Sequence, residues 1–319
     1  MNKKSLFITA TAIVLSASVV SSAMAQRTVI NTNQNNVARA IAETNAGITR
    51  TGATVGGKVD ATTAAIANTA SVSTNRVATI NNSQTNNQFV SATLNLGTAT
   101  SAVNNVRDVT ATSAAIANSA SNTIRNTTAD ATNINNYQAA SGGVQSRLNS
   151  NINGVTGNVN QTAAAIGNTF TADITGPIGT INNTQRYWGD VNTQLNTKVE
   201  NVSGDVVGTA AAICNTGTVT STNAASINAN NNQACNIDPS ATTNALIQNV
   251  GGKVNLTTAA IGNTFSLTTL PTATLNVNNL QQNGAINVAT ANLTLANVAG
   301  DIALTTAAIG NSFTVSGGN

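Results

Sequence analysis

The string Ala-Ala-Ile-x-Asn occurs six times, and its regular spacing constrains the fold more than any other feature of the chain. Its isoleucine recurs about every 50 positions, at Ile66, Ile116, Ile166, Ile213, Ile261 and Ile309. A second marker, an aliphatic residue followed by Asn and a nearby Gln, has the same period around Ile30, Ile80, Ile134, Ile181, Ile227 and Val277. Two independent markers with one period indicate a repeat protein.

The spacing of apolar and small residues inside the repeat favours β-strands. After each motif isoleucine they recur at every second position, as in Ile261, Asn263, Phe265 and Leu267, which predicts that this set faces the interior. Val254 and Leu256 are at even-numbered positions, whereas the set that begins at Ile261 is odd-numbered. We therefore expect a corner between them, at the Thr-Thr-Ala-Ala run. A helix ending at Gly262 is the alternative, although threonine runs disfavour helices.

Strands, corners and a fixed period predict an all-β fold, a β-solenoid of the parallel β-helix type with six repeats of about 50 residues. On this prediction each repeat holds two coils of roughly 25 residues. The solenoid domain spans residues 26–319, with repeats at approximately 30–79, 80–133, 134–180, 181–226, 227–276 and 277–319.

The six asparagines of the motif are the first candidate site residues. We expect them to stack as an inward-facing ladder, because amides donate to and accept from one another and so remain hydrogen-bonded when buried. The alternative places them at turns, where asparagine is also favoured. They are Asn68, Asn118, Asn168, Asn215, Asn263 and Asn311.

Cys214 and Cys235 are the only cysteines in the chain, and Cys214 occupies the variable position of its motif. In an exported protein the simplest expectation is one disulfide between them. The stretch from one to the other is close in length to one of the predicted coils, so the bond would join adjacent coils. Two thiols without histidine do not suit a metal site, and the chain lacks the Cys-x-x-Cys spacing of redox catalysts.

The first 25 residues have the pattern of a secretory signal peptide. Lys3 and Lys4 precede an uncharged run from Leu6 to Val20, and Ala23-Met24-Ala25 forms a cleavage site before Gln26. A membrane anchor is the alternative, but the run is shorter than the ~20 residues of a spanning helix. We therefore expect a secreted protein without a membrane-spanning segment in the mature chain, either associated with the outer membrane at the cell surface or extracellular.

Composition argues against several functions. Without Lys3 and Lys4 the 13 basic residues fall to 11, against 10 acidic ones, and the basic ones are scattered, which disfavours nucleic acid as a partner. There is no histidine, the commonest general base and metal ligand. No acidic residue recurs in all six repeats, as calcium-binding solenoids require. We expect no catalytic site, cofactor or metal.

Tyr187 and Trp188 form the one local aromatic cluster, and Trp188 is the only tryptophan. If exposed, the pair could stack on sugar rings or on a partner surface. The alternative is that both side chains pack against the solenoid.

The export signal, the Asn-, Thr-, Ala- and Gly-rich composition and the repeats resemble bacterial surface fibre and adhesin proteins. Two elements, Ile80-Asn81-Asn82-Ser83-Gln84 and Ala165-Ile166-Gly167-Asn168, are similar to the amide ladders of curlin-type subunits, whose units are about half as long. The whole mature chain also resembles the holdfast-anchor proteins, which tie an adhesive polysaccharide to the cell envelope. These resemblances imply attachment or biofilm scaffolding.

We therefore expect a non-catalytic structural protein of the bacterial cell surface, acting in adhesion, holdfast anchoring or fibre assembly. Expected partners are further copies of the chain or another outer-membrane protein, with a polysaccharide as a further candidate. The alternative is an ice-binding solenoid, suggested by the pairs Thr98/Thr100, Thr110/Thr112 and Thr272/Thr274, although these do not recur at one place in the repeat.

Overall fold

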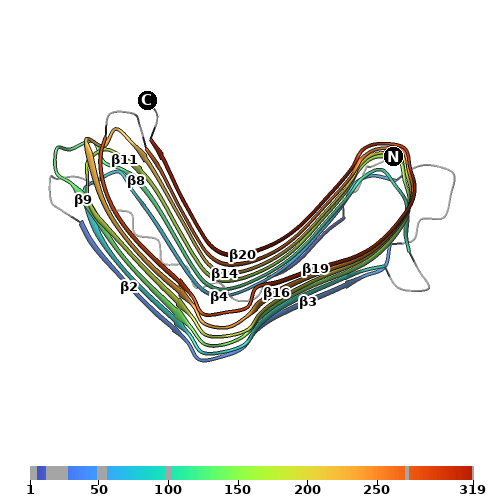
Figure 1. Ribbon diagram of the computed structural model, residues 1–319, viewed down its shortest axis with the longest axis horizontal. Helices are drawn as coiled ribbons and strands as arrows, with labels where there is room; N and C mark the ends of the chain where they lie inside the picture. The colour runs from blue at the N-terminus through green and yellow to red at the C-terminus, as the bar shows by residue number, and fades with distance from the viewer. Residues whose placement is uncertain (1–5, 12–27, 49–55, 98–101, 270–272, 318–319) are drawn as a thin grey trace.

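The chain forms three parallel β-sheets that wind around one axis (Figure 1). The computed structural model describes residues 6–11, 28–48, 56–97, 102–269 and 273–317. The predicted cleavage site at Ala23–Ala25 and three of the threonines considered above, Thr98, Thr100 and Thr272, lie outside these residues.

Each sheet stacks strands from successive repeats. Sheet A contains β1 (Leu6–Thr11), β4 (Val59–Thr74), β8 (Val109–Arg125), β11 (Val159–Thr175), β14 (Val206–Thr222), β17 (Val254–Thr269) and β20 (Ile302–Gly317). Sheet B contains β2 (Thr28–Asn36), β5 (Ala78–Asn86), β9 (Thr132–Ala140), β12 (Ile178–Tyr187), β15 (Ser226–Cys235) and β18 (Thr274–Asn283). Sheet C contains β3 (Ala40–Ala46), β6 (Val90–Leu96), β10 (Val144–Val155), β13 (Val191–Val202), β16 (Pro239–Val250) and β19 (Val288–Val298), and the short β7 (Val103–Val106) also pairs with β10.

One coil therefore consists of a strand in sheet B, a strand in sheet C and a strand in sheet A, taken in chain order. The prediction of an all-β solenoid is confirmed. The prediction of two coils per repeat is wrong, since six coils accommodate the six repeats. From β4 onward the strands of sheet A have 16 or 17 residues and cross the whole width of the molecule, so one repeat completes only one circuit.

The sheet-A strands bend near their middle, and the bend lies later in the motif than the sequence predicts. In β17 the run from Thr257 to Ala260 continues the strand, with Thr258 and Ala260 buried. Ile261 is only half-buried, and the next two residues, Gly262 and Asn263, both face the interior. The alternation of buried and exposed positions therefore shifts by one residue at the variable residue and the asparagine of the motif. The predicted corner at Thr-Thr-Ala-Ala and the predicted inward orientation of the isoleucine are both wrong, because the change of face follows the isoleucine.

In cross-section the molecule is a chevron (Figure 1). Sheet A forms the concave side, and sheets B and C form the two arms of the convex side. The first half of each sheet-A strand packs on sheet C through valines and leucines, and the second half packs on sheet B through isoleucines and phenylalanines. Between the two arms, at the elbow, sheet A contributes alanines, where small side chains let the layers approach.

The coils stack in register, so that equivalent residues of successive repeats lie one above another. In the fifth coil Ala229 stacks on Ile181, while Ile227 pairs with Leu275, so the second sequence marker is shifted by two residues there. At the end of the sheet-C strands one position has left-handed backbone, which suits Asn and Gly. This position is occupied by Asn105, Gly154, Asn201, Asn249 and Asn297. Within the described residues, no helix is long and apolar enough to cross a membrane.

Candidate binding surfaces

The motif asparagines lie in the interior at the bend of sheet A. The amide nitrogen of Asn118 donates to the side-chain oxygen of Asn168 at 2.8 Å, and Asn168 donates in turn to Asn215 at 2.7 Å. The second N–H of each amide crosses the interior, as from Asn168 to the Arg186 carbonyl of sheet B at 3.0 Å. Both amide protons are therefore satisfied, as buried polar groups require. The column runs from Asn68 to Asn311, whose side chain is exposed in the last coil.

A column of glutamines in sheet B faces the motif asparagines and is bonded in the opposite axial direction. The amide nitrogen of Gln185 donates to Gln138 in the preceding coil at 2.8 Å, and also to the Thr216 carbonyl of sheet A at 2.9 Å. Two amide columns thus connect coil to coil and sheet A to sheet B. The glutamine column consists of Gln34, Gln84, Gln138, Gln185, Gln233 and Gln281.

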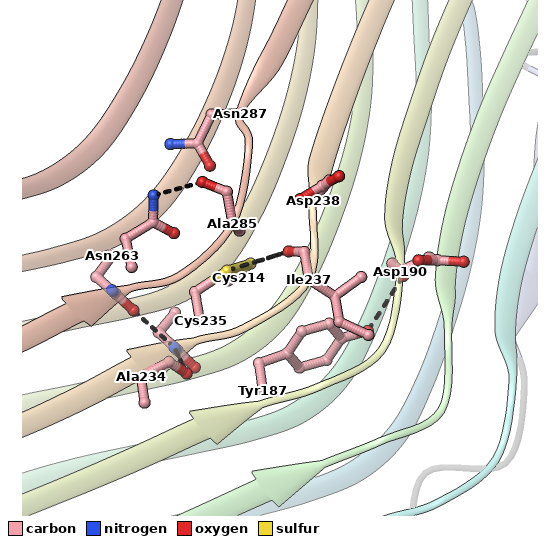
Figure 2. The surroundings of a disulfide bond; sticks show 12 residues. Tyr187, Asp190, Cys214, Ala234, Cys235, Ile237, Asp238, Asn263, Ala285 and Asn287 are labelled. Carbon is pink, nitrogen blue, oxygen red and sulfur yellow. Dashed lines mark hydrogen bonds between the residues drawn. A yellow bond between two sulfur atoms is a disulfide. The ribbon is translucent and has the colours of Figure 1, made fainter.

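The variable residue of the motif faces the end of the next sheet-B strand. Gly167 lies against the ring of Tyr187, and a β-carbon at Gly167 would overlap that ring. One coil further on, the same two positions hold Cys214 and Cys235, which are joined by a disulfide (Figure 2). Gly262 similarly makes room for the side chain of Asn283. Gly167 and Gly262 thus leave room both for the side chain that they face and for a backbone oxygen of the next coil.

The disulfide joins β14 to β15, the next strand along the chain, across the interior between sheets A and B. Both cysteines are fully buried. The expectation that the stretch between them spans a whole coil is wrong, because one coil takes up an entire repeat. The bond instead encloses the turn through which sheet A of the fourth coil leads into sheet B of the fifth.

Tyr187 and Trp188 do not form a surface pair. Tyr187 is fully buried beside the disulfide, and its hydroxyl donates to the Gly142 carbonyl at 2.8 Å. The same hydroxyl lies 3.3 Å from the Asp190 carbonyl (Figure 2). Burial, with a smaller effect from the charge of Asp190, raises the pKa of this phenol. The prediction that Tyr187 belongs to a binding surface is wrong. Trp188 is 38% exposed at the elbow.

The outer faces of sheets B and C each carry a row of asparagines. Most of the sheet-B row belongs to the second sequence marker, but the sequence did not indicate that it lies on the surface, and the sheet-C row was not identified. Neighbouring side chains in both rows are linked by hydrogen bonds of 2.6 to 2.9 Å. The sheet-B row is Asn31, Asn81, Asn135, Asn182, Asn230 and Asn278, and the sheet-C row is Asn45, Asn95, Asn149, Asn196, Asn244 and Asn292. Both outer asparagine rows could have been found from the sequence, because each consists of an asparagine that recurs with the period of the repeat.

Shallow grooves follow both outer asparagine rows. The groove on sheet C has a volume of about 600 Å³ and runs from Gly97 in the second coil to Asn292 in the sixth. The groove on sheet B has a volume of about 370 Å³, and Tyr137, which is 41% exposed, lies in it. Each row amide has two donors and two acceptor sites, and the row itself uses one of each, so uncharged hydrogen-bonding capacity faces the solvent at every coil.

The outer face of sheet A has a different chemistry. Next to the bend it carries the six motif isoleucines, and on either side of them lie rows of alanine, threonine and serine. None of these rows contains a charged residue in any coil. The first-coil members of these rows, in order along the strand, are Thr62, Ala64, Ile66, Thr69 and Ser71. An unbroken row of partly exposed isoleucines is unusual on a protein surface.

Charged groups are dispersed and close to the surface. The described residues form five ion pairs, among them Arg107 with Asp108 at 2.7 Å and Arg125 with Asp173 at 2.7 Å. The hydrogen bond from Arg107, together with the backbone N–H of Asn158, lowers the pKa of Asp108. Within the described part of the chain, no three or more His, Cys, Asp or Glu side chains come together as a metal site would require.

The family model for holdfast attachment protein D (HfaD) matches residues 103–319, about two thirds of the chain. The chain belongs to the holdfast attachment protein D family. None of the curated proteins and none of the solved structures matches it. The resemblance to holdfast-anchor proteins is therefore confirmed, and the HfaD match makes the chain a holdfast-related protein of the cell surface.

The region matched by the HfaD family covers β7 to β20, and so includes the disulfide, Tyr187 and most of each outer row. In this HfaD-family chain, the features with the most regular geometry are the interior amide columns and the uncharged outer faces. Most of the site residues predicted from the sequence, namely the motif asparagines up to Asn263, the cysteines and Tyr187, lie in the interior of the solenoid, whereas Trp188 is partly exposed. The accessible faces carry the motif isoleucines and the outer asparagine rows, to which the sequence assigned no surface role.

Proposed function

We propose that this protein is an exported, non-catalytic structural component of the bacterial cell surface that anchors the holdfast. The HfaD family match carries the proposal. The fold supports it, because six coils in register form a continuous body whose faces repeat the same chemistry from end to end. Such surfaces suit extended attachment rather than the chemistry of a single substrate.

The proposal includes removal of residues 1–25 during export. Strand β1 lies within that segment and pairs with β4 at the edge of sheet A. On cleavage β4 becomes the first strand of sheet A, and every remaining coil contributes to all three sheets. Sequencing the N-terminus of the protein recovered from cells tests this step; a start at Gln26 supports it, and retention of Lys3 and Lys4 contradicts it.

We assign the surface partners to further copies of this chain or to another outer-membrane protein, with a neutral polysaccharide as a further candidate. The outer asparagine rows support the last of these, since their amides are uncharged and repeat at each coil. The absence of histidine from the sequence, together with the dispersal of the ionisable groups, supports a non-catalytic role.

A deletion strain tests the anchoring role most directly. We expect cells without this protein to lose retention on surfaces and to shed holdfast material into the medium, while a plasmid copy restores both. Fractionation should recover the protein with the outer membrane or outside the cell. Normal attachment of the deletion strain would overturn the proposal.

An ice-binding function is the second candidate, and one observation favours it. Hydroxyl residues alternate on the outer face of sheet A at two stacked positions in all six coils, for example Thr169 with Thr171 and Thr216 with Thr218. Serine occupies either position in several coils, as in Ser119 and Ser121, so the array lacks regular methyl groups. The predicted pair Thr110/Thr112 is not repeated, since Thr110 stacks between Asp60 and Asn160. Thermal hysteresis in a solution of the purified protein would establish ice binding.

A further inference from the structure

The isoleucine row on the outer face of sheet A is the feature that the proposed function leaves unexplained. It consists of Ile66, Ile116, Ile166, Ile213, Ile261 and Ile309. The first five are partly exposed, and Ile309 is 36% exposed. A continuous apolar row on a protein surface, bordered by polar residues, is typical of an interaction site.

The shape of the molecule restricts what can cover this row. Each isoleucine lies one residue before the point where two successive residues face the interior, so the row lies at the bend of sheet A. The bend opens away from the core, and the row therefore lies in the concave side of the chevron (Figure 1). A flat partner would meet the two arms of sheet A without reaching the bend, whereas a partner with a convex ridge would contact both the arms and the row.

The opposite side of the same molecule is such a ridge. The turns that connect sheets B and C form the outer elbow of the chevron (Figure 1), and we call them the elbow turns. Several of them expose an apolar side chain: Val37 is 72% exposed, Trp188 38% and Ile286 69%, while Phe89 and Ile237 are partly exposed. The elbow turns are residues 37–39, 87–89, 141–143, 188–190, 236–238 and 284–287.

The two sides also agree in spacing. Both the isoleucines and the elbow turns occur once per coil, so their axial spacing is the same, about 4.8 Å. The rows that flank the isoleucines are small and uncharged in every coil, and the outer faces of sheets B and C carry mainly asparagine, serine and threonine. Charge on the ridge is limited to single exposed residues in three elbow turns, Arg39, Asp190 and Asp238. Faces made of small uncharged side chains can pack closely, as in dry interfaces between stacked sheets.

We infer that a second copy of this chain covers the isoleucine row, with its elbow turns seated in the concave side of the first. The contact is heterologous, since a concave face meets a convex one. In a pair, one molecule keeps its convex face free and the other keeps its concave face free, so the assembly continues sideways, perpendicular to the solenoid axis. This inference deepens the self-association included in the proposed function, and it names the two surfaces that take part.

Sedimentation of the purified full chain tests the inference. We expect the wild type to form species whose mass grows with concentration, and the Ile166→Lys/Ile213→Lys variant to remain monomeric. Both side chains point outward, so circular dichroism should be unchanged; if the charged variant does not fold, Ile166→Thr/Ile213→Thr gives the same comparison with β-branched residues. Ser203→Lys, on the exposed turn between β13 and β14, is the matched control and should assemble like the wild type.

Directed cross-linking distinguishes sideways nesting from stacking end to end. A chain with Ile166→Cys is mixed with a chain carrying Trp188→Cys, and the mixture is oxidised. Nesting predicts a disulfide-linked heterodimer well above the roughly twofold excess over each homodimer that random pairing of an equimolar mixture gives, because the concave row of one molecule meets the ridge of the other. A heterodimer at or below that random ratio, a monomeric wild type, or assembly that persists in the isoleucine variants would overturn the inference.

The attachment assay separates this inference from the anchoring role. If the isoleucine variant is monomeric and still restores attachment to the deletion strain, nesting is supported as a property of the protein and is not needed for anchoring. If the wild type assembles by nesting and deletion leaves attachment normal, the inference is supported and the anchoring role is overturned.

Discussion

At the scale of single residues, the interior is held by amides that use their full hydrogen-bonding capacity. A motif asparagine gives one proton to the next coil and one to sheet B, and it accepts a proton from the coil before. In a low-dielectric interior such chains strengthen one another, and the loss of one member leaves its neighbours unpaired.

Replacing Asn263 by leucine should therefore be costly. The change leaves the Asn215 amide and the Gln282 carbonyl without their partner. Each buried group left unpaired costs about 1–3 kcal/mol, so the free energy of unfolding should fall by at least that amount in thermal or denaturant melts. Asn182→Leu makes the same change in an outer asparagine row, and we expect an effect within about 0.5 kcal/mol there. Equal melting of Asn263→Leu and wild type would contradict a stabilising role for the interior column.

The variable position of the motif provides a second test. In Gly167→Ala the new methyl group would overlap the Tyr187 ring, and overpacking of this kind costs about 1–3 kcal/mol. The same substitution should cost less when Tyr187 is already alanine, since Ala117 of the second coil and Ala140 of the third occupy the corresponding positions. Unfolding of the four proteins of this cycle by denaturant measures the coupling. Equal costs of Gly167→Ala in both backgrounds would show that the two positions are independent.

At the scale of elements, the central feature is a sheet-A strand that crosses both arms of the chevron and changes its buried face once. The sequence showed that the apolar positions are even-numbered in the first half of the strand, as in Val254 and Leu256, and odd-numbered in the second half, as in Phe265 and Leu267. The position at which the buried face changes was not visible, because Gly262 and Asn263, which both face the interior at the bend, are not large apolar residues that mark a buried position. Small residues in the Thr-Thr-Ala-Ala run suggested a turn, yet they are small because the elbow is narrow there.

The disulfide connects two such elements and should stabilise the turn between them. Closing a loop of 21 residues contributes on the order of 3 kcal/mol. The Cys214→Ala/Cys235→Ala variant reproduces the pair formed by Ala117 of the second coil and Ala140 of the third, so we expect it to fold and to lose about that amount in denaturant melts. The native wild type should have a mass two protons below that of the reduced chain and should resist thiol labelling even when unfolded without reductant. Full labelling under those conditions would show that the bond is absent.

At the scale of the whole molecule, the repeat and the fold class followed from the sequence because both depend on period. The number of coils per repeat did not follow, since one long strand such as β14 and two shorter strands joined by a corner have the same alternation. The accessible surfaces were missed for a related reason. Asn149 or Ile166 carries no signal of which way it points until the register and the bend are known.

The pH dependence of stability is also a property of the whole chain. Without histidine, we expect unfolding free energy to be flat from about pH 5 to 9. Burial raises the pKa of Tyr187, so its contribution is present below the ordinary value of about 10 and is lost as pH rises beyond that value. The pKa of Asp108 is lowered, so its smaller contribution is present above about 4 and is lost in acid. Urea melts across this range measure the profile. A midpoint that shifts steeply near pH 6.5 would contradict it.

The correspondence of one repeat with one coil makes the length of this protein independent of its cross-section. An added repeat would lengthen the body by about 4.8 Å, and every outer row would gain one member without any change in the turns or the core. Duplication or loss of a single unit in the gene is therefore a small structural event. Natural variants of different length could keep the same lateral contacts, so that reach from the envelope and strength of assembly can be adjusted in steps of one coil.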